Sequence, residues 1–135
     1  MVLVDSSVWV NYFNGIVTWQ TEMLDQMLQQ IPVLTGDLIL TEVLQGFRSD
    51  KDFMRAKEVM GILPCKEMVG HHIAIQSAKS YRKLRKKGIT VRKTIDVIIG
   101  TYCITENLPL LHDDKDFDPM AEHLGLKTIS RAIVQ

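Results

Sequence analysis

The sequence is poor in several features that would place a protein in a special class. Its 135 residues include two cysteines, Cys65 and Cys103, which match no spacing of a metal or redox motif. We therefore expect two reduced thiols in the core of a cytoplasmic protein. No apolar run approaches the roughly 20 residues of a membrane-spanning helix. The amino terminus also lacks the basic flank and cleavage site of a secretory signal.

The chain also lacks net charge, because 16 basic residues balance 16 acidic ones. This balance argues against a protein that coats nucleic acid nonspecifically. The charges are nevertheless segregated: half of the Lys and Arg residues fall within 79–93, and aspartates gather within 113–118. A hydrophobic content of 46% is that of an ordinary globular domain. With no internal repeat or low-complexity tract, we expect a single domain over residues 1–135.

The apolar pattern predicts short strands that alternate with helices. The predicted strands cover residues 2–4, 33–34, 66–69, 109–111 and 127–129. The predicted helices cover residues 8–13, 18–30, 38–47, 50–62, 71–87, 95–107 and 119–124. Residues 35–37 are expected to form a turn, and Asp50 and Thr94 are expected to cap the helices that follow them. The alternation predicts an α/β fold with a mainly parallel sheet covered by helices on both faces.

Acidic side chains follow two of the predicted strands. Asp5 follows the first strand, and the aspartates of segment 113–116 follow the strand at 109–111. Because parallel strands end at one edge of a sheet, we expect these groups to meet there. Asp96 lies in the first turn of the helix at 95–107, whose apolar residues surround its axis almost completely. Carboxylates gathered in this way suit Mg²⁺ or Mn²⁺.

Four motifs contain these acids and one further acid, Glu42. They read Val-Asp-Ser-Ser-Val-Trp at 4–9, Leu-Thr-Glu-Val at 40–43, Thr-Ile-Asp-Val-Ile-Ile-Gly at 94–100 and Leu-Leu-His-Asp-Asp-Lys-Asp-Phe at 110–117. In this order and spacing the chain resembles a PIN domain over essentially its whole length. More narrowly, it is similar to the VapC toxins of toxin–antitoxin modules. The resemblance implies a PIN-like three-layer α/β/α fold with a short-stranded central sheet.

The resemblance also implies roles for the acids. The implied catalytic acids are Asp5, Glu42, Asp96, Asp114 and Asp116. Asp5, Asp96 and Asp114 would hold the metal ion directly or through water. Glu42 would complete the shell or orient the attacking water. Asp113, Asp114 and Asp116 compete for one position in the family's pattern, so the assignment within this loop stays open.

Substrate contacts are less clearly marked than the acids. Ser7 matches a small hydroxyl residue that neighbours the site in the family, and it is a candidate substrate-binding residue. Lys79, Lys83 and Lys86 lie opposite the apolar face of the helix at 71–87. These lysines either contact the RNA backbone or form an ordinary solvated face, and both interpretations stay open.

The implied function is that of a Mg²⁺-dependent endoribonuclease, with Mn²⁺ as an alternative metal. The enzyme would act as the toxin of a VapBC-type module and inhibit translation, leaving a 5′-phosphate and a 3′-hydroxyl on the cleaved RNA. The implied partners are RNA, a VapB-type antitoxin and a second copy of the chain, with no membrane association. Trp9, Tyr12 and Phe13 form a candidate hydrophobic patch for the antitoxin or the second copy.

Two other functions remain open from the sequence. A PIN fold can serve as a noncatalytic module that binds nucleic acid or protein, or as a nuclease that acts mainly on DNA. Each acid taken alone also has an ordinary structural explanation, such as a helix cap at Asp5 or a helix-dipole contact at Asp96. The nuclease hypothesis therefore depends on the acids converging in the folded chain.

Overall fold

A computed structural model describes residues 1–131, which are built around a four-stranded parallel sheet. The strands are β1 (Val2–Val4), β2 (Val33–Gly36), β3 (Cys65–Lys66) and β4 (Leu110–Leu111), in the spatial order β3-β2-β1-β4. Leu3 aligns with Leu34 of β2 on one side and with Leu110 of β4 on the other. The central position of β1 explains why all three of its residues are apolar and buried.

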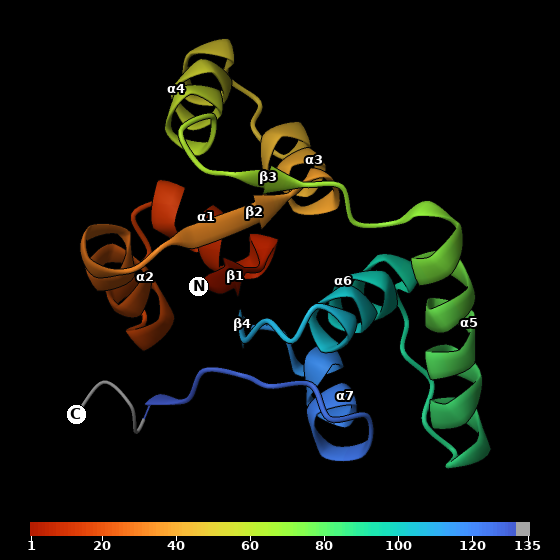
Figure 1. Ribbon diagram of the computed structural model, residues 1–135. Helices are drawn as coiled ribbons and strands as arrows, with labels where there is room; N and C mark the ends of the chain where they lie inside the picture. The colour runs from red at the N-terminus through yellow and green to blue at the C-terminus, as the bar shows by residue number, and fades with distance from the viewer. Residues whose placement is uncertain (132–135) are drawn as a thin grey trace.

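Helices cover both faces of this sheet, as the sequence predicts (Figure 1). They are α1 (Ser6–Phe13), α2 (Trp19–Gln30), α3 (Asp37–Gln45), α4 (Asp50–Met60), α5 (Gly70–Lys86), α6 (Thr94–Thr105) and α7 (Asp118–His123), with a 3₁₀ turn η1 (Lys115–Phe117) before the last. Helix α1 packs against α2 and α3, whereas α5 packs against α6. β4 lies on the other side of β1 from β2 and β3, so crossovers of the usual right hand put these two groups of helices in opposite layers. Within residues 1–131, no helix combines the length and the apolar character needed to cross a membrane.

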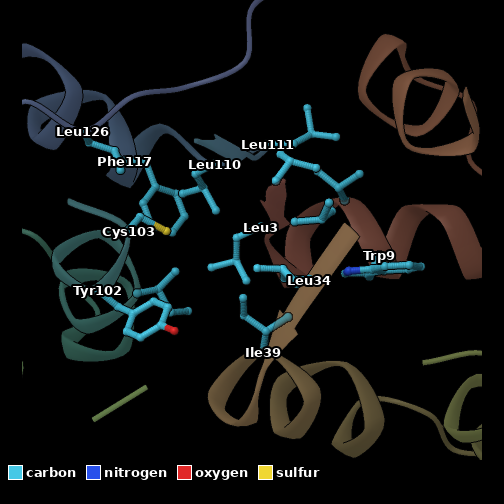
Figure 2. Close-up of a cluster of buried hydrophobic side chains, with 14 of the residues drawn as sticks. Leu3, Trp9, Leu34, Ile39, Tyr102, Cys103, Leu110, Leu111, Phe117 and Leu126 are labelled. Carbon is cyan, nitrogen blue, oxygen red and sulfur yellow. The ribbon is translucent and has the colours of Figure 1, made fainter. Parts of the chain in front are cut away.

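The core joins both helix layers through the sheet (Figure 2). Leu3 and Leu110 of the sheet are fully buried, as are Trp9 of α1, Ile39 of α3 and Ile99 of α6. Helix α6 is buried on nearly all sides, which confirms the prediction made from its apolar residues. In its first turn Asp96 and Val97 are buried, whereas Thr94 is exposed.

The sheet differs from the predicted one in three places. Residues 35–36 belong to β2 and are not part of a turn, and the strand predicted at 66–69 is limited to Cys65–Lys66. Asp37 opens α3, and its Oδ1 accepts the Leu38 and Met68 N–H groups at 2.8 and 3.1 Å. The strand predicted at 127–129 is a single parallel bridge between Thr128 and Leu110. Asp37 thus joins the start of α3 to the backbone at Met68, two residues after β3 ends.

Two helix caps were predicted at the wrong residue. Ser49 caps α4 by accepting the Asp52 N–H at 3.1 Å, so Asp50 is the first helical residue and not the cap. Lys93 precedes α6 at the cap position without a side-chain hydrogen bond, and Thr94 already lies in the helix. In both cases the prediction was one residue too late, an error typical of helix ends read from sequence.

Two predictions about burial also need correction. Cys103 is buried as expected, but Cys65 is exposed on the short edge strand β3. Trp9 has no exposed surface, and Phe13 stacks on it at 5.7 Å and meets Phe47 edge-on at 5.9 Å. Trp9 therefore cannot take part in an open patch, whereas Tyr12 and Phe13 are half-buried, and their contact with a partner stays a prediction.

Candidate metal centre at the carboxyl edge of the sheet

Asp5 leaves the central strand β1 where the sheet changes its direction of connection. The chain runs from β1 to β2 on one side, whereas β4, the neighbour of β1 on the other side, is reached only after β3. Ligands of open α/β sheets bind at such a switch point. Asp5 caps α1, since its Oδ2 accepts the Ser7 N–H at 3.1 Å and the Ser7 hydroxyl at 2.7 Å. Its Oδ1 is buried and has no hydrogen-bond partner among the described residues. One oxygen of the Asp5 carboxylate therefore caps α1, while the other is available to bind a ligand.

Glu42 and Asp96 approach Asp5 from opposite helix layers. One carboxylate oxygen from each of these three residues lies within 4.8 Å of the other two. The Ser6 hydroxyl donates to Glu42 Oε1 at 3.1 Å and so fixes that side chain from the start of α1. Asp96, in the first turn of α6, is only 2% exposed, and its Oδ2 has no hydrogen-bond partner within residues 1–131.

The loop after β4 brings two further acids to Asp96. Carboxylate oxygens of Asp96, Asp114 and Asp116 also lie within 4.8 Å of one another. Asp114 caps η1 by accepting the Asp116 N–H at 2.9 Å, and its other oxygen is 3.6 Å from Lys93 Nζ. Asp113 is exposed and belongs to neither group, although its N–H donates to the Ser7 hydroxyl at 3.0 Å. The geometry thus favours Asp114 and Asp116 over Asp113 for the loop position that the sequence left open.

Burial and mutual repulsion disfavour the charged forms of these acids. Burial raises the pKa of Asp5 and of Glu42 above their ordinary values, and the charge of Asp5 adds to the effect at Glu42. Burial, followed by the charges of Asp5 and Asp114, raises the pKa of Asp96 to about 7. The same negative field raises the pKa of Lys93, mainly through Asp96 and Asp114. The negative charge of the acids is therefore only partly balanced by Lys93.

The donor set fits a divalent cation. Three buried carboxylate oxygens, on Asp5, Asp96 and Asp116, have no hydrogen-bond partner in the described part of the chain. Unpartnered buried carboxylate oxygens are costly unless a cation compensates them. An all-oxygen set of this kind suits a hard ion, and Asp96 belongs to both groups of ligand atoms. The cluster could hold a metal ion through these residues.

Some functional candidates were missed by the sequence reasoning, and others lie elsewhere. Lys93 and Ser6 contact the acids directly but were not singled out, because a lysine in a basic run and a serine after a strand carry no distinctive signal. Lys79 and Lys83 line a separate hollow of about 370 Å³ between α5 and α6. No ion pair found within residues 1–131 joins either of them, or the exposed Lys86, to the acids.

The fold and the acidic cluster together define a known class of protein. The chain belongs to the PIN-domain family, whose model matches residues 2–123. It is 26% identical over 132 residues to a protein of Mycobacterium bovis named VapC ribonuclease, covering 96% of this chain and 98% of that protein. Ribonuclease VapC11 of Mycobacterium tuberculosis shows the same identity and coverage.

Solved structures with the same fold come from several bacteria. VapBC2 from Rickettsia felis, bound to a DNA fragment from their promoter, matches with a TM-score of 0.76 and 13% identity over 96% of this chain and 98% of that chain. VapBC-1 from nontypeable Haemophilus influenzae matches with a TM-score of 0.73 and 16% identity over 98% and 99% of the two chains. VapC20 of Mycobacterium tuberculosis, described as a toxin that cleaves the sarcin-ricin loop, matches with a TM-score of 0.65 and 13% identity over 87% and 93%.

Proposed function

We propose that this chain is a Mg²⁺-dependent endoribonuclease and the toxin of a VapBC-type toxin–antitoxin module that inhibits translation. The observation that carries the proposal is the convergence of five acids from four segments at one edge of the sheet, with three of their buried oxygens unpartnered. The likeness to two proteins named as VapC ribonucleases, over nearly the whole of each chain, supports the same activity. Residues 1–135 would act as one PIN domain.

In this proposal Asp5, Asp96 and Asp114 hold the metal ion, and Mn²⁺ can replace Mg²⁺. When bound, the ion lowers the pKa of the attacking water and stabilises negative charge on the phosphate oxygens. Glu42, fixed at Oε1 by the Ser6 hydroxyl, orients that water with its other oxygen. Asp116 completes the acidic set next to Asp96.

Positive charge near the acids is needed because RNA phosphates would otherwise be repelled. Lys93 is well placed for this role, since its side chain is 58% exposed while its Nζ stays 3.6 Å from Asp114. Ser7 uses its hydroxyl to join Asp5 to the backbone of Asp113, so it positions the acid and the loop, and a direct contact with substrate remains a prediction. The contacts of Lys79, Lys83 and Lys86 with RNA also remain predictions.

The reaction does not require the RNA 2′-hydroxyl as a nucleophile. Water attack on the phosphorus, with the 3′-oxygen leaving, gives a 5′-phosphate and a 3′-hydroxyl. A 2′,3′-cyclic phosphate among the products would exclude this route.

The partners follow from the same likeness. Several structural neighbours are VapBC complexes, so we propose a VapB-type antitoxin as the partner of this chain, with a homodimer of the toxin within the assembly and the cytoplasm as its location. Co-expression with a cognate VapB-type antitoxin should restore growth that the toxin alone arrests.

The direct test is cleavage of total cellular RNA with Mg²⁺ by the chain and by Asp5→Asn and Asp96→Asn variants. Both variants should lose cleavage while their circular dichroism spectra stay native. Asp50→Asn is a matched control, because Asp50 is exposed in the first turn of α4 and outside the acidic cluster. Binding of RNA without cleavage would favour a noncatalytic binding module. Cleavage of DNA but not RNA would favour a nuclease that acts mainly on DNA.

A further inference from the structure

A hollow of about 390 Å³ opens beside the acidic cluster and shares Asp114 with it. The hollow is lined by Trp19 and Gln20 at the start of α2, by His112 and Asp114 after β4, and by Thr128 in the segment that runs back from α7 (Figure 1). Its volume lies in the range of pockets that take small molecules, about 300–1,000 Å³. None of the roles proposed above uses Trp19, Gln20 or His112.

Gln20 is a polar side chain placed in this hollow without a protein partner. It is 9% exposed, and no hydrogen bond of its side-chain amide occurs within residues 1–131. The amide nitrogen and oxygen lie at the solvent-accessible wall of the hollow, since neither is among the fully buried side-chain atoms without a partner in the described residues. The amide offers both a donor and an acceptor to whatever enters the hollow.

His112 adds a donor whose position the backbone determines. Its Nδ1 accepts the Asp114 N–H at 3.2 Å, so the neutral ring carries its proton on Nε2. The ring also packs against Phe117, with centroids 5.0 Å apart, which restrains its orientation. His112 thus lines the hollow with a restrained ring whose Nε2 N–H is a donor.

Trp19 supplies an aromatic surface. Its indole is partly exposed, and the aromatic ring pairs found in the described residues do not include it. An indole at the wall of a hollow beside the proposed cleavage site suits stacking of a planar ligand. Three carboxylates line the hollow, on Asp113, Asp114 and Asp118, against one cation, Lys115, so the net negative charge favours a neutral ligand over a phosphate.

We infer that this hollow binds the nucleobase adjacent to the scissile phosphate, stacked on Trp19 and hydrogen-bonded by Gln20 and His112. The inference rests on the proposed ribonuclease function and assigns it a base-recognition site. The acceptors around the hollow favour a base with an exocyclic amino group over uracil. The base would enter while its phosphate lies toward Asp114 and the metal centre.

The first experiment pairs an enzyme variant with a substrate lacking one base. Trp19→Ala should lower kcat/KM for a short cleavable RNA by roughly 5- to 150-fold, the usual effect of losing one base–aromatic stack. Trp19→Phe should retain most of the activity. An abasic nucleotide at the contacted position should impair the parent enzyme but cause little further loss in Trp19→Ala, because the same contact is already absent. Equal and additive losses at every abasic position would overturn the inference.

A second experiment separates failure of base recognition from failure of the ribonuclease proposal, because it measures binding without cleavage. In the Asp96→Asn background, a short oligoribonucleotide containing adenine, cytosine or guanine should quench indole fluorescence. The quench should disappear in Trp19→Phe, which leaves Trp9 as the remaining tryptophan. An oligouridylate should quench less. Quenching that persists in Trp19→Phe, or its absence in the parent background, would refute the base site even if RNA cleavage is confirmed.

Discussion

Replacing Asp96 with asparagine should stabilise the metal-free protein while abolishing its activity. Asp96 is 2% exposed, and burial together with the charges of Asp5 and Asp114 raises its pKa to about 7, against 3.8 in a model compound. Ionising Asp96 therefore costs more free energy in the folded state than in the unfolded state. Asparagine has nearly the same shape and carries no charge.

The sign and size of the effect follow from proton linkage. Between about pH 4 and pH 7 the folded state holds a proton on Asp96 that the unfolded state has released, so the free energy of unfolding falls as pH rises through this window. A difference of about three pH units corresponds to about 4 kcal/mol at pH values above the window. The Asp96→Asn variant should gain up to this amount near pH 8 and almost none near pH 4.

Urea unfolding in the presence of a chelator, repeated across this pH range, measures the difference. The m-value should be unchanged, since the substitution alters little surface. Addition of Mg²⁺ should stabilise the parent protein, because ion binding to the folded state favours folding. The difference in free energy of unfolding between the variant and the parent should then become smaller. A variant that is less stable than the parent near pH 8, or a gap that does not change with pH, would refute the reasoning.

Three further predictions concern other contacts of the centre. Ser7→Ala removes the hydroxyl that donates to Asp5 and accepts the Asp113 N–H, so it should cost about 1–3 kcal/mol in urea unfolding and reduce cleavage; an unchanged midpoint would show that water replaces the hydroxyl. Lys93→Ala should raise KM and reduce the salt dependence of RNA binding by about one phosphate contact, whereas Lys57→Ala, on the exposed face of α4, should change either much less. Chelation should abolish cleavage and lower Tm, and Mg²⁺ or Mn²⁺, but not Na⁺ at the same ionic strength, should restore both; retained activity in chelator would contradict a metal-dependent reaction.

The layer architecture could be predicted because it depends on patterns that survive in a single sequence. The buried run Val2–Val4 and the nearly all-apolar helix α6 have one stable environment each, the centre of the sheet and the interior of a layer. Element ends were less predictable. Thr35 and Gly36 resemble a turn locally, and only the pairing of β2 with the residues 30 positions further on keeps them extended.

The proximity of the acids could be anticipated only in part. Asp5 and the loop after β4 follow neighbouring strands, so their meeting follows from strand order. Glu42 is different, because nothing local to α3 distinguishes it from a solvated helix residue; its approach depends on how α3 packs on α1 and on the hydroxyl of Ser6. Lys93 could not be selected from a basic run, since its role depends on the position of Asp114.

The acids gathered around the proposed ion and its water come from opposite sides of the sheet, Glu42 from α3 and Asp96 from α6. A bound cation would therefore connect the two helix layers and would not stabilise one loop alone. Amide hydrogen exchange should then slow in both α3 and α6 when the ion binds, although Glu42 and Asp96 are 54 residues apart in the chain. The stability of the folded chain and its proposed cleavage activity would therefore both depend on the concentration of that ion.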